Sequence, residues 1–286
     1  MGERPIAAND GADPALEALS ERFRGARRVV ALTGAGVSTD SGIPDYRDAE
    51  GGWKHRRPIQ YRAFMDRSAA RQRYWARSMA GWPRMRDATP NLAHQALTRL
   101  EHAGALHYVI TQNVDGLHQR AGSRRVIDLH GRLDTVACQD CGQRLHRDAI
   151  QELLQAANPG LDPGVEALAP DGDAELAAGA AAGFQVPHCP ACGGLFKPEV
   201  VFFGERVPAA TVADAFARLD EADLLLVAGS SLMVWSGYRF VRHAAAAGIP
   251  VAIIGHGRTR GDPEATFRVH GACGTLLDAL ARDRGA

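Results

Sequence analysis

Short runs of apolar residues recur along the chain, and each ends in glycine or in a polar residue. The clearest lie in RRVVALTGAG (27–36), HYVITQN (107–113), DLLLVAGSS (223–231) and PVAIIG (250–255). Shorter ones lie in RVIDLHG and EVVFFGE. Four to six consecutive apolar residues bounded by glycine are typical of strands buried on both faces. We therefore expect strands in these six segments.

Helical spacing of apolar residues separates these runs. It predicts helices over 12–24, 69–79, 91–102 (with Asn91 as N-cap), 209–220, 237–247 and 274–283. Strands that alternate with helices predict an α/β fold in which helices cover a parallel sheet. The alternation breaks at 51–90, which suggests a small helical module, and at 134–198, which contains a loop-like Ala/Gly/Pro/Asp insertion at 160–183.

Composition and charge narrow the functional classes. The 286 residues suffice for about two domains. The 33 basic side chains balance 33 acidic ones, which argues against a nucleic acid partner, because such proteins usually carry a basic excess. No apolar run reaches the roughly 18 residues of a transmembrane helix, and the N-terminal segment lacks the pattern of a secretory or transit peptide. We therefore expect a cytoplasmic protein without a membrane partner.

A glycine turn, Thr33-Gly34-Ala35-Gly36, follows the first predicted strand. Glycines at such a turn let a phosphate approach the backbone N–H groups, but the same turn also occurs without a ligand. The dinucleotide fingerprint G-x-G-x-x-G would require glycine at position 39, where the chain has Thr39. The turn therefore indicates nucleotide binding of a kind that departs from the dehydrogenase pattern.

Four of the five cysteines form two matched pairs, Cys138-x-x-Cys141 and Cys189-x-x-Cys192, each followed by glycine. Each pair suits half of a tetrahedral zinc site. Buried free thiols and a redox pair are the alternatives, and the matched spacing favours zinc. Because four protein ligands would close the site, we expect one structural Zn²⁺ rather than a catalytic one.

Polar residues follow three of the predicted strands. They are Gln112-Asn113-Val114-Asp115, Asp128-Leu129-His130 and Gly229-Ser230-Ser231. In an open parallel sheet, ligands bind beyond the carboxyl ends of the strands. Each set alone is also a common turn. Together with the glycine turn they predict a binding site at this edge, and His130 is the best candidate for a general base, because its ordinary pKa is near ~6.5.

Six segments, in this order, resemble the motifs of sirtuins, the NAD-dependent protein-lysine deacylases. They are GAGVSTDSGIPDYRD, TQNVDGLH, LHG, the paired CxxC, KPEVVFFGE and GSSLMV, and the resemblance spans roughly residues 25–283. Further segments resemble the class II branch, which includes a mitochondrial sirtuin with lipoamidase and ADP-ribosyltransferase activities. They are RRPIQY, RQRYWARSMAGWP, APDGDAEL and SGYRF.

The resemblance implies a Rossmann-like, doubly wound parallel sheet with two inserted parts. The Rossmann-like domain would comprise 25–58, 91–133 and 199–286. Residues 59–90 would form the helical module and 134–198 a small zinc-ribbon domain. Residues 1–11 would form a flexible tail, and we expect a monomer. NAD and the acylated lysine of a protein substrate would enter the cleft between the two domains from opposite sides.

The resemblance also implies roles for individual residues. His130 would be the catalytic base and Asn113 a second catalytic residue. The substrate peptide would pair with the segment Val201, Phe202, Phe203 and Gly204, with Val201 and Phe203 near the acyl-lysine. The NAD-binding residues would be Gly34, Ala35, Gly36, Thr39, Asp45, Tyr46, Arg47, Gln112, Asn113, Val114, Asp115, Gly229, Ser230, Ser231, Gly255, His256, Gly257 and Cys273.

The implied reaction transfers the acyl group from lysine to ADP-ribose and releases nicotinamide. Three other functions stay open: mono-ADP-ribosyl transfer to protein from the same site, a non-enzymatic zinc-ribbon binding module, and, as the weakest, a dehydrogenase. Two departures from the family stand out. Gly255-His256-Gly257 replaces the asparagine that usually holds the adenosine ribose. The insertion around 160–183 leaves undecided which acyl group is removed from lysine.

Overall fold

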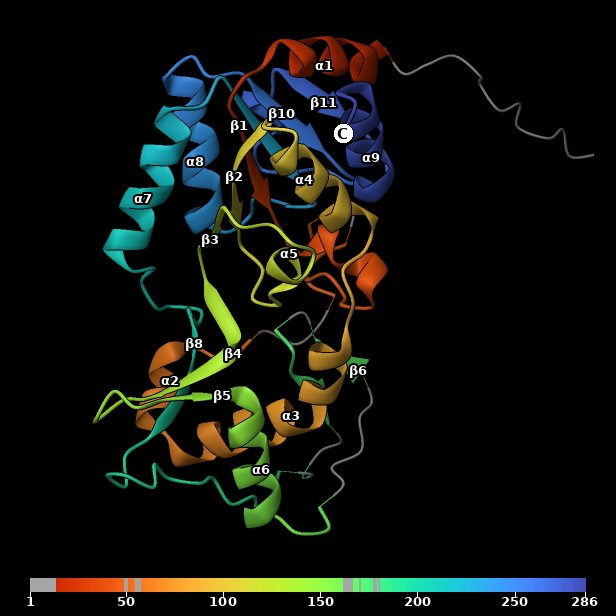
Figure 1. The fold of residues 1–286 in the computed structure, drawn as a ribbon. Coiled ribbons are helices and arrows are strands. Elements are labelled where there is room, and N and C mark those ends of the chain that lie inside the picture. Colours follow the sequence, from red (N-terminus) through yellow and green to blue (C-terminus); the bar gives the residue numbers. More distant parts are fainter. Residues whose placement is uncertain are drawn as a thin grey trace, which may run out of the picture.

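The molecule has two lobes, an α/β lobe and a smaller lobe beneath it in Figure 1. A computed structural model describes residues 14–48, 51–54, 58–161, 167–169, 171–176, 179 and 181–286. The predicted N-terminal tail, residues 1–11, lies outside the described residues.

A six-stranded parallel sheet forms the centre of the larger lobe, in the order β11-β10-β9-β1-β2-β3. Strands β2 and β3 lie on one side of β1, and β9, β10 and β11, which come later in the chain, lie on the other side. The order of the strands therefore reverses between β1 and β9, which is where ligands bind in such sheets. The strands are β1 Val29–Thr33, β2 Leu106–Thr111, β3 Val126–Asp128, β9 Leu224–Ala228, β10 Val251–Ile254 and β11 Phe267–Val269.

The register places three strand ends at one level. Thr33 pairs with Ala228 of β9 on one side and with Thr111 of β2 on the other. The backbone bonds continue past the strands, because Gly34 N donates to Ala228 O (3.1 Å) and Gln112 N donates to Thr33 O (3.0 Å). The turns after β1, β2 and β9 consequently lie side by side.

Helices cover both faces of this sheet (Figure 1). Val29 and Ala31 of β1 share a buried cluster with α1 Pro14–Gly25, α4 Leu92–His102 and α9 Cys273–Asp283. Val30 and Leu32 face the other way, toward α7 Ala209–Asp220 and α8 Trp235–Ala246. Since alternate residues of one strand serve opposite faces, β1 has to be apolar throughout.

The smaller lobe combines two segments that are far apart in the sequence. Its antiparallel sheet, β5-β4-β8, comprises β4 Gly131–Cys138, β5 Arg144–His146 and β8 Phe196–Val200. The helices are α2 Tyr61–Asp66, α3 Ser68–Asp87 and α6 Arg147–Ala157, beside the short hairpin β6 Ala167–Leu168 and β7 Ala174–Glu175. Phe64 and Trp75 share one buried cluster with Val136, Ile150 and Phe196.

Several predicted elements differ from the structure. The strand expected at 199–205 is β8, which ends at Val200 and pairs antiparallel with β4 instead of joining the parallel sheet. Helix α3 runs on to Asp87, and α6 and β11 were not predicted. Short helical turns also occur at Ala35–Val37, Thr39–Ser41, Leu117–Arg120 (α5) and Asp262–Glu264. Within the described part of the chain, every helix is too short or too polar to cross a membrane.

Candidate active site

A cavity of about 870 Å³ opens where the turns after β1, β2 and β9 face the smaller lobe. We refer to it as the cleft. Every residue predicted to bind NAD, to bind the substrate peptide or to act in catalysis lines the cleft, with the exception of Gly257. Residues that were not predicted as site residues also line it, among them Ser38, Trp53, Tyr74, Asp171, Ser236 and Arg239.

The glycines of the first turn are required by its contact with the turn after β9. A Cβ atom on Gly36 would lie 2.9 Å from Gly229 Cα, and one on Gly34 would lie 2.8 Å from Ser230 Cβ. Gly36 N donates to Gly229 O (2.8 Å), and Gly229 itself has φ 61°. These glycines therefore allow close packing of two turns, and they leave backbone rather than side chains at this wall of the cleft.

Asn113 belongs to a buried chain of polar groups. Its Nδ2 donates to Gly34 O (3.1 Å) and to Ser38 Oγ (3.0 Å). The Ser38 hydroxyl donates in turn to Asp115 Oδ2 (2.8 Å), whose other oxygen accepts from Leu117 N (2.8 Å). This chain fixes the turn after β2 against the glycine turn. Ser38 was not predicted as a site residue, although it stands in the polar segment that follows the glycines.

Gln112 links the ends of three strands. Its Nε2 donates to Thr33 O (3.2 Å) and to Ser230 Oγ (2.8 Å), and Ser230 Oγ also accepts from Leu232 N (3.2 Å). Leu232 has φ 58°, a conformation that is uncommon for a residue other than glycine. The turn after β9 is thus held in one conformation at the rim of the cleft.

His130, on the turn between β3 and β4, is bonded at both ring nitrogens. Nδ1 lies 2.9 Å from Gln112 O and Nε2 lies 2.7 Å from Ser236 Oγ. A carbonyl oxygen only accepts, so Nδ1 carries the proton and Nε2 carries the lone pair. Burial lowers the pKa of His130 below its ordinary value, the Gln112 carbonyl opposes this, and the charge of Arg239 adds to it. The ring is therefore neutral and able to accept a proton at neutral pH.

The segment around Asp45, Tyr46 and Arg47 folds back on itself beside the cleft. Lys54 Nζ lies 2.6 Å from Asp45 Oδ1, and the Arg47 guanidinium stacks 4.0 Å from the centre of the Trp53 ring. Tyr46 packs edge-on against Trp53, with ring centres 6.1 Å apart. Burial and the charge of Asp171 raise the pKa of Tyr46, so its hydroxyl keeps the proton.

The predicted substrate segment is held at several points of its backbone. Val201 N donates to His130 O (2.8 Å), and Phe203 O accepts from Tyr61 N (2.8 Å). The ring of Phe203 contacts those of Tyr46 and Trp53, at 6.3 and 5.8 Å between centres. The segment therefore connects His130, the smaller lobe and the Tyr46 loop.

An ion pair between a buried lysine and a partly exposed glutamate supports the same segment. Lys197, which is only 5% exposed, donates to Val200 O (2.7 Å) and pairs with Glu205 (3.0 Å). Glu205 also accepts from Phe202 N (2.8 Å). Because removing Glu205 would leave the buried charge of Lys197 uncompensated, this pair fixes the turn that follows β8.

Arg268 holds the backbone of Gly255 and Gly257, the segment in which the sequence lacks the expected asparagine. Its guanidinium donates to Gly255 O (3.1 Å) and to Gly257 O, and it pairs with Asp262 (3.1 Å). Gly255 and Gly257 have φ 139° and 72°. Burial raises the pKa of the neighbouring Cys273 to about 11, so this cysteine is a thiol and not a reactive thiolate.

The insertion also contacts the cleft. Asp171 lines it, while Asp173 is buried 3.8 Å from Arg77 of α3. A Cβ atom on Gly81 would lie 2.1 Å from Gly172 O, so the insertion packs directly on α3.

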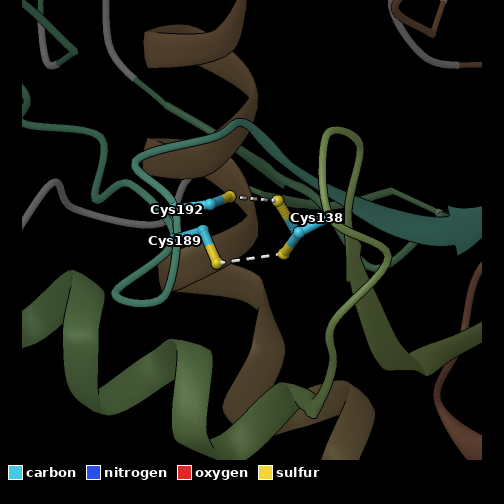
Figure 2. Close-up of side chains that lie close together, drawn as sticks. Cys138, Cys189 and Cys192 are labelled. Carbon is cyan, nitrogen blue, oxygen red and sulfur yellow. Dashed lines mark hydrogen bonds between the residues drawn. The ribbon is translucent and has the colours of Figure 1, made fainter.

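The four paired cysteines meet in the smaller lobe (Figure 2). Their sulfur atoms all lie within 4.8 Å of one another, with 3.5 Å between Cys138 and Cys192 and 3.8 Å between Cys141 and Cys189. Four thiolates around Zn²⁺ at about 2.3 Å stand about 3.8 Å apart in a tetrahedron. The donor set and its spacing therefore fit one structural zinc ion.

Comparisons with known proteins agree with this architecture. The family model "Sir2 family" matches residues 34–236. An NAD-dependent protein deacetylase of Xanthomonas campestris pv. campestris (strain 8004) is 55% identical over 93% of this chain and 90% of its own length. One from Bordetella bronchiseptica is 52% identical over 92% of this chain and 96% of its own.

Solved structures give the same result. A Sir2–p53 peptide–NAD⁺ complex is similar with a TM-score of 0.78, at 29% identity over 94% of this chain and 98% of that chain. A Sir2 homologue in complex with NAD has a TM-score of 0.72, at 30% identity over 94% of this chain and 93% of that chain. The sheet order, the cysteine cluster and these matches together show that the chain belongs to the Sir2 family.

Proposed function

We propose that this protein is an NAD-dependent protein-lysine deacylase. The observation that carries the proposal is His130, a neutral imidazole that lines the cleft and carries its lone pair at Nε2, where the Ser236 hydroxyl bonds it. The names of relatives that are 52 to 55% identical support the same activity. The fold, with a parallel sheet and a cysteine cluster, is that of a Sir2 enzyme.

The chemistry of the cleft wall suits NAD. Backbone without side chains at Gly34, Gly36 and Gly229 leaves room for the pyrophosphate, and we assign Ala35 and Thr39 to the same part. NAD supplies an electrophilic ribose carbon with nicotinamide as its leaving group. We assign Gln112, Asn113, Val114 and Asp115 to the nicotinamide half, Asp45, Tyr46 and Arg47 to a covering loop, and Ser230, Ser231, Gly255, His256, Gly257 and Cys273 to the adenosine half.

The substrate peptide is proposed to bind along Val201, Phe202, Phe203 and Gly204. This segment follows β8 without belonging to a strand, and Phe203 forms a bridge with Gln60. An extended peptide could add to it by backbone hydrogen bonds. His130, whose carbonyl bonds Val201 N, would then stand next to the acylated lysine and accept a hydroxyl proton at Nε2.

We further propose assignment to the class II branch, which the RQRYWARSMAGWP and SGYRF segments support. We also propose the domain boundaries that the sequence suggested. The helical module, 59–90, and the zinc-ribbon domain, 134–198, share one buried cluster and form one lobe. A zinc–thiolate cluster requires reduced cysteines, which supports a cytoplasmic location, and we propose a monomer.

The decisive experiment is a panel of acyl-lysine peptides with acetyl, dicarboxylic, long-chain and lipoyl groups, analysed by mass spectrometry with and without NAD. We expect NAD-dependent loss of at least one acyl group and formation of O-acyl-ADP-ribose. His130→Ala should abolish both. No turnover across the panel would reject the proposal, and label from NAD that accumulates on protein would indicate ADP-ribosyl transfer instead.

A further inference from the structure

The imidazole of His130 has a partner that was not predicted as a site residue, Ser236 in the first turn of α8. Its Oγ lies 2.7 Å from Nε2, while Gln112 O lies 2.9 Å from Nδ1. With Nδ1 protonated, the serine hydroxyl donates to the lone pair of Nε2 in the neutral ring. One group at the end of β2 and one on α8 therefore hold the ring at both of its nitrogens.

The two partners of the ring belong to one packed unit. A Cβ atom on Gly237 would lie 2.5 Å from Gln112 Oε1, so the first turn of α8 rests on the residue whose carbonyl bonds Nδ1. Arg239 Nε donates to the carbonyl oxygen of Ser236 (3.1 Å), which fixes this turn from the other side. The serine hydroxyl is thus placed by the backbone around it.

We propose that Ser236 is a positioning residue for His130: its hydroxyl and the Gln112 carbonyl together orient the ring toward the cleft and stabilise the imidazolium that forms when Nε2 takes a proton. When that happens, the O–H bond of the reacting hydroxyl breaks and its oxygen keeps the electron pair. Nε2 has a single lone pair, so the Ser236 hydroxyl first rotates its hydrogen away from Nε2 and leaves the lone pair to the reacting hydroxyl. The proton then forms the Nε2–H bond, and Ser236 Oγ changes from donor to acceptor without any change in its own covalent bonds.

The energetic reason lies in the strength of the two bonds that Ser236 can make. A bond from a charged N–H to oxygen is about twice as strong as one between neutral groups. Ser236 therefore favours the protonated ring, against burial and against the charge of Arg239. The carboxylates on neighbouring elements already have partners: Asp115 bonds Ser38, Asp128 bonds Gln119, and Glu205 pairs with Lys197.

The first test uses the protein without NAD, so it does not depend on the proposed function. Histidine ¹⁵N NMR of Ser236→Ala should show the Nε2 signal of an unbonded lone pair. The titration midpoint of His130 should fall by about 0.5 to 1 pH unit, a three- to tenfold loss of proton affinity. Ser236→Thr keeps the hydroxyl and should titrate as wild type does. Ser68→Ala, an exposed serine in the first turn of α3, is the matched control.

The second test rests on the proposed deacylase activity. At neutral pH, Ser236→Ala should lower deacylation about three- to tenfold, while nicotinamide exchange, which precedes the proton transfer, stays at the wild-type rate. Unchanged Nε2 signals and titration in Ser236→Ala would overturn the proposal, as would an equal loss of exchange, deacylation and stability. If wild-type protein proved inactive, the titration would still decide whether Ser236 acts on His130.

Discussion

Ser38 is fully buried, yet its hydroxyl joins two residues of the cleft. It accepts from Asn113 Nδ2 and donates to Asp115 Oδ2. A serine can do both at once, whereas alanine can do neither. The positions of the amide and of the carboxylate, both in the turn after β2, therefore depend on a residue from the turns after β1.

Gly229 is a residue at which a single methyl group should be damaging. Its φ of 61° disfavours other residues, and a Cβ atom would lie 2.5 Å from Val37 N. We expect Gly229→Ala to lower the free energy of unfolding in urea by about 2–5 kcal/mol, from strain and overlap together. Gly25→Ala, where a Cβ atom meets nothing within 4 Å, should change it by less than about 1 kcal/mol. Equal effects of the two substitutions would contradict this.

Two neighbouring histidines should make the fold sensitive to acid. Burial lowers the pKa of His94 to about 4, and burial lowers that of His118 well below its ordinary value; the two rings lie 4.8 Å apart. Between their unfolded pKa of about 6.5 and pH 4, the unfolded chain binds more protons than the folded one. The contribution to stability is therefore complete above about pH 6.5 and is lost as the pH falls.

Urea unfolding at pH 7, 6 and 5 measures this loss. His94→Gln removes one of the titrating groups and places at the third helical position of α4 a residue that can still complete the capping box. The pH dependence of the variant should be shallower than that of the wild-type protein. An identical slope would show that His94 does not contribute.

Among the elements, α4 depends clearly on its N-cap residue, Asn91. Asn91 Oδ1 accepts from Ala93 N (2.9 Å), and its Nδ2 donates to Val37 O (2.8 Å) and Ser41 Oγ (2.9 Å). The same side chain therefore caps the helix and ties it to the turns after β1.

The two roles of Asn91 can be separated by substitution. Asn91→Ala should cost about 2–3 kcal/mol of unfolding free energy, from the cap and the lost bonds to the turns. Asn91→Asp keeps the cap acceptor but not the donors, so its cost should be about half. Thermal and urea denaturation would measure both. If the two variants were equally unstable, the cap would not contribute separately.

The elements also show what the sequence pattern can and cannot predict. Helix α7 was predicted with its observed bounds, 209–220, because its apolar face is regular and isolated. Helix α6 was missed because it stands in a region that the cysteines and the loop-like insertion marked as irregular. The partner of β8 is set by the return of the chain into the smaller lobe, which local periodicity does not encode.

The same limit applies to the cleft. Of the residues that the motifs predicted for the cleft, all but Gly257 line it. Most of them follow strands whose ends lie in register. The SGYRF segment was recognised only as a resemblance, and neither Ser236 nor Arg239 was predicted to act on His130, which lies more than 100 residues away in the sequence. Such contacts follow from packing and not from the local sequence.

For the whole molecule, the cysteine cluster is expected to decide whether the smaller lobe is folded. Removal of zinc with a chelator should expose the core shared by α3 and β4, because a structural zinc contributes directly to folding energy. Tryptophan fluorescence should shift to the red, since Trp75 and Trp82 lie in that core. Metal analysis should give one zinc per chain.

Two cysteine variants provide the comparison. Cys138→Ser should lose zinc and show the red-shifted emission without chelator, whereas Cys273→Ser, in the larger lobe, should retain one zinc. A metal-free protein with unchanged emission would show that the cluster is not a zinc site.

The two lysines differ sharply in their surroundings. Lys197 is buried next to the predicted substrate segment, while Lys54 is half-exposed and pairs with Asp45, next to Tyr46. An amine-directed dye should consequently distinguish them, reacting with the side chain of Lys54 and sparing that of Lys197. The chain thus offers a natural attachment point for a reporter beside the cleft, through which movement of the Tyr46 loop could be followed without introducing a cysteine.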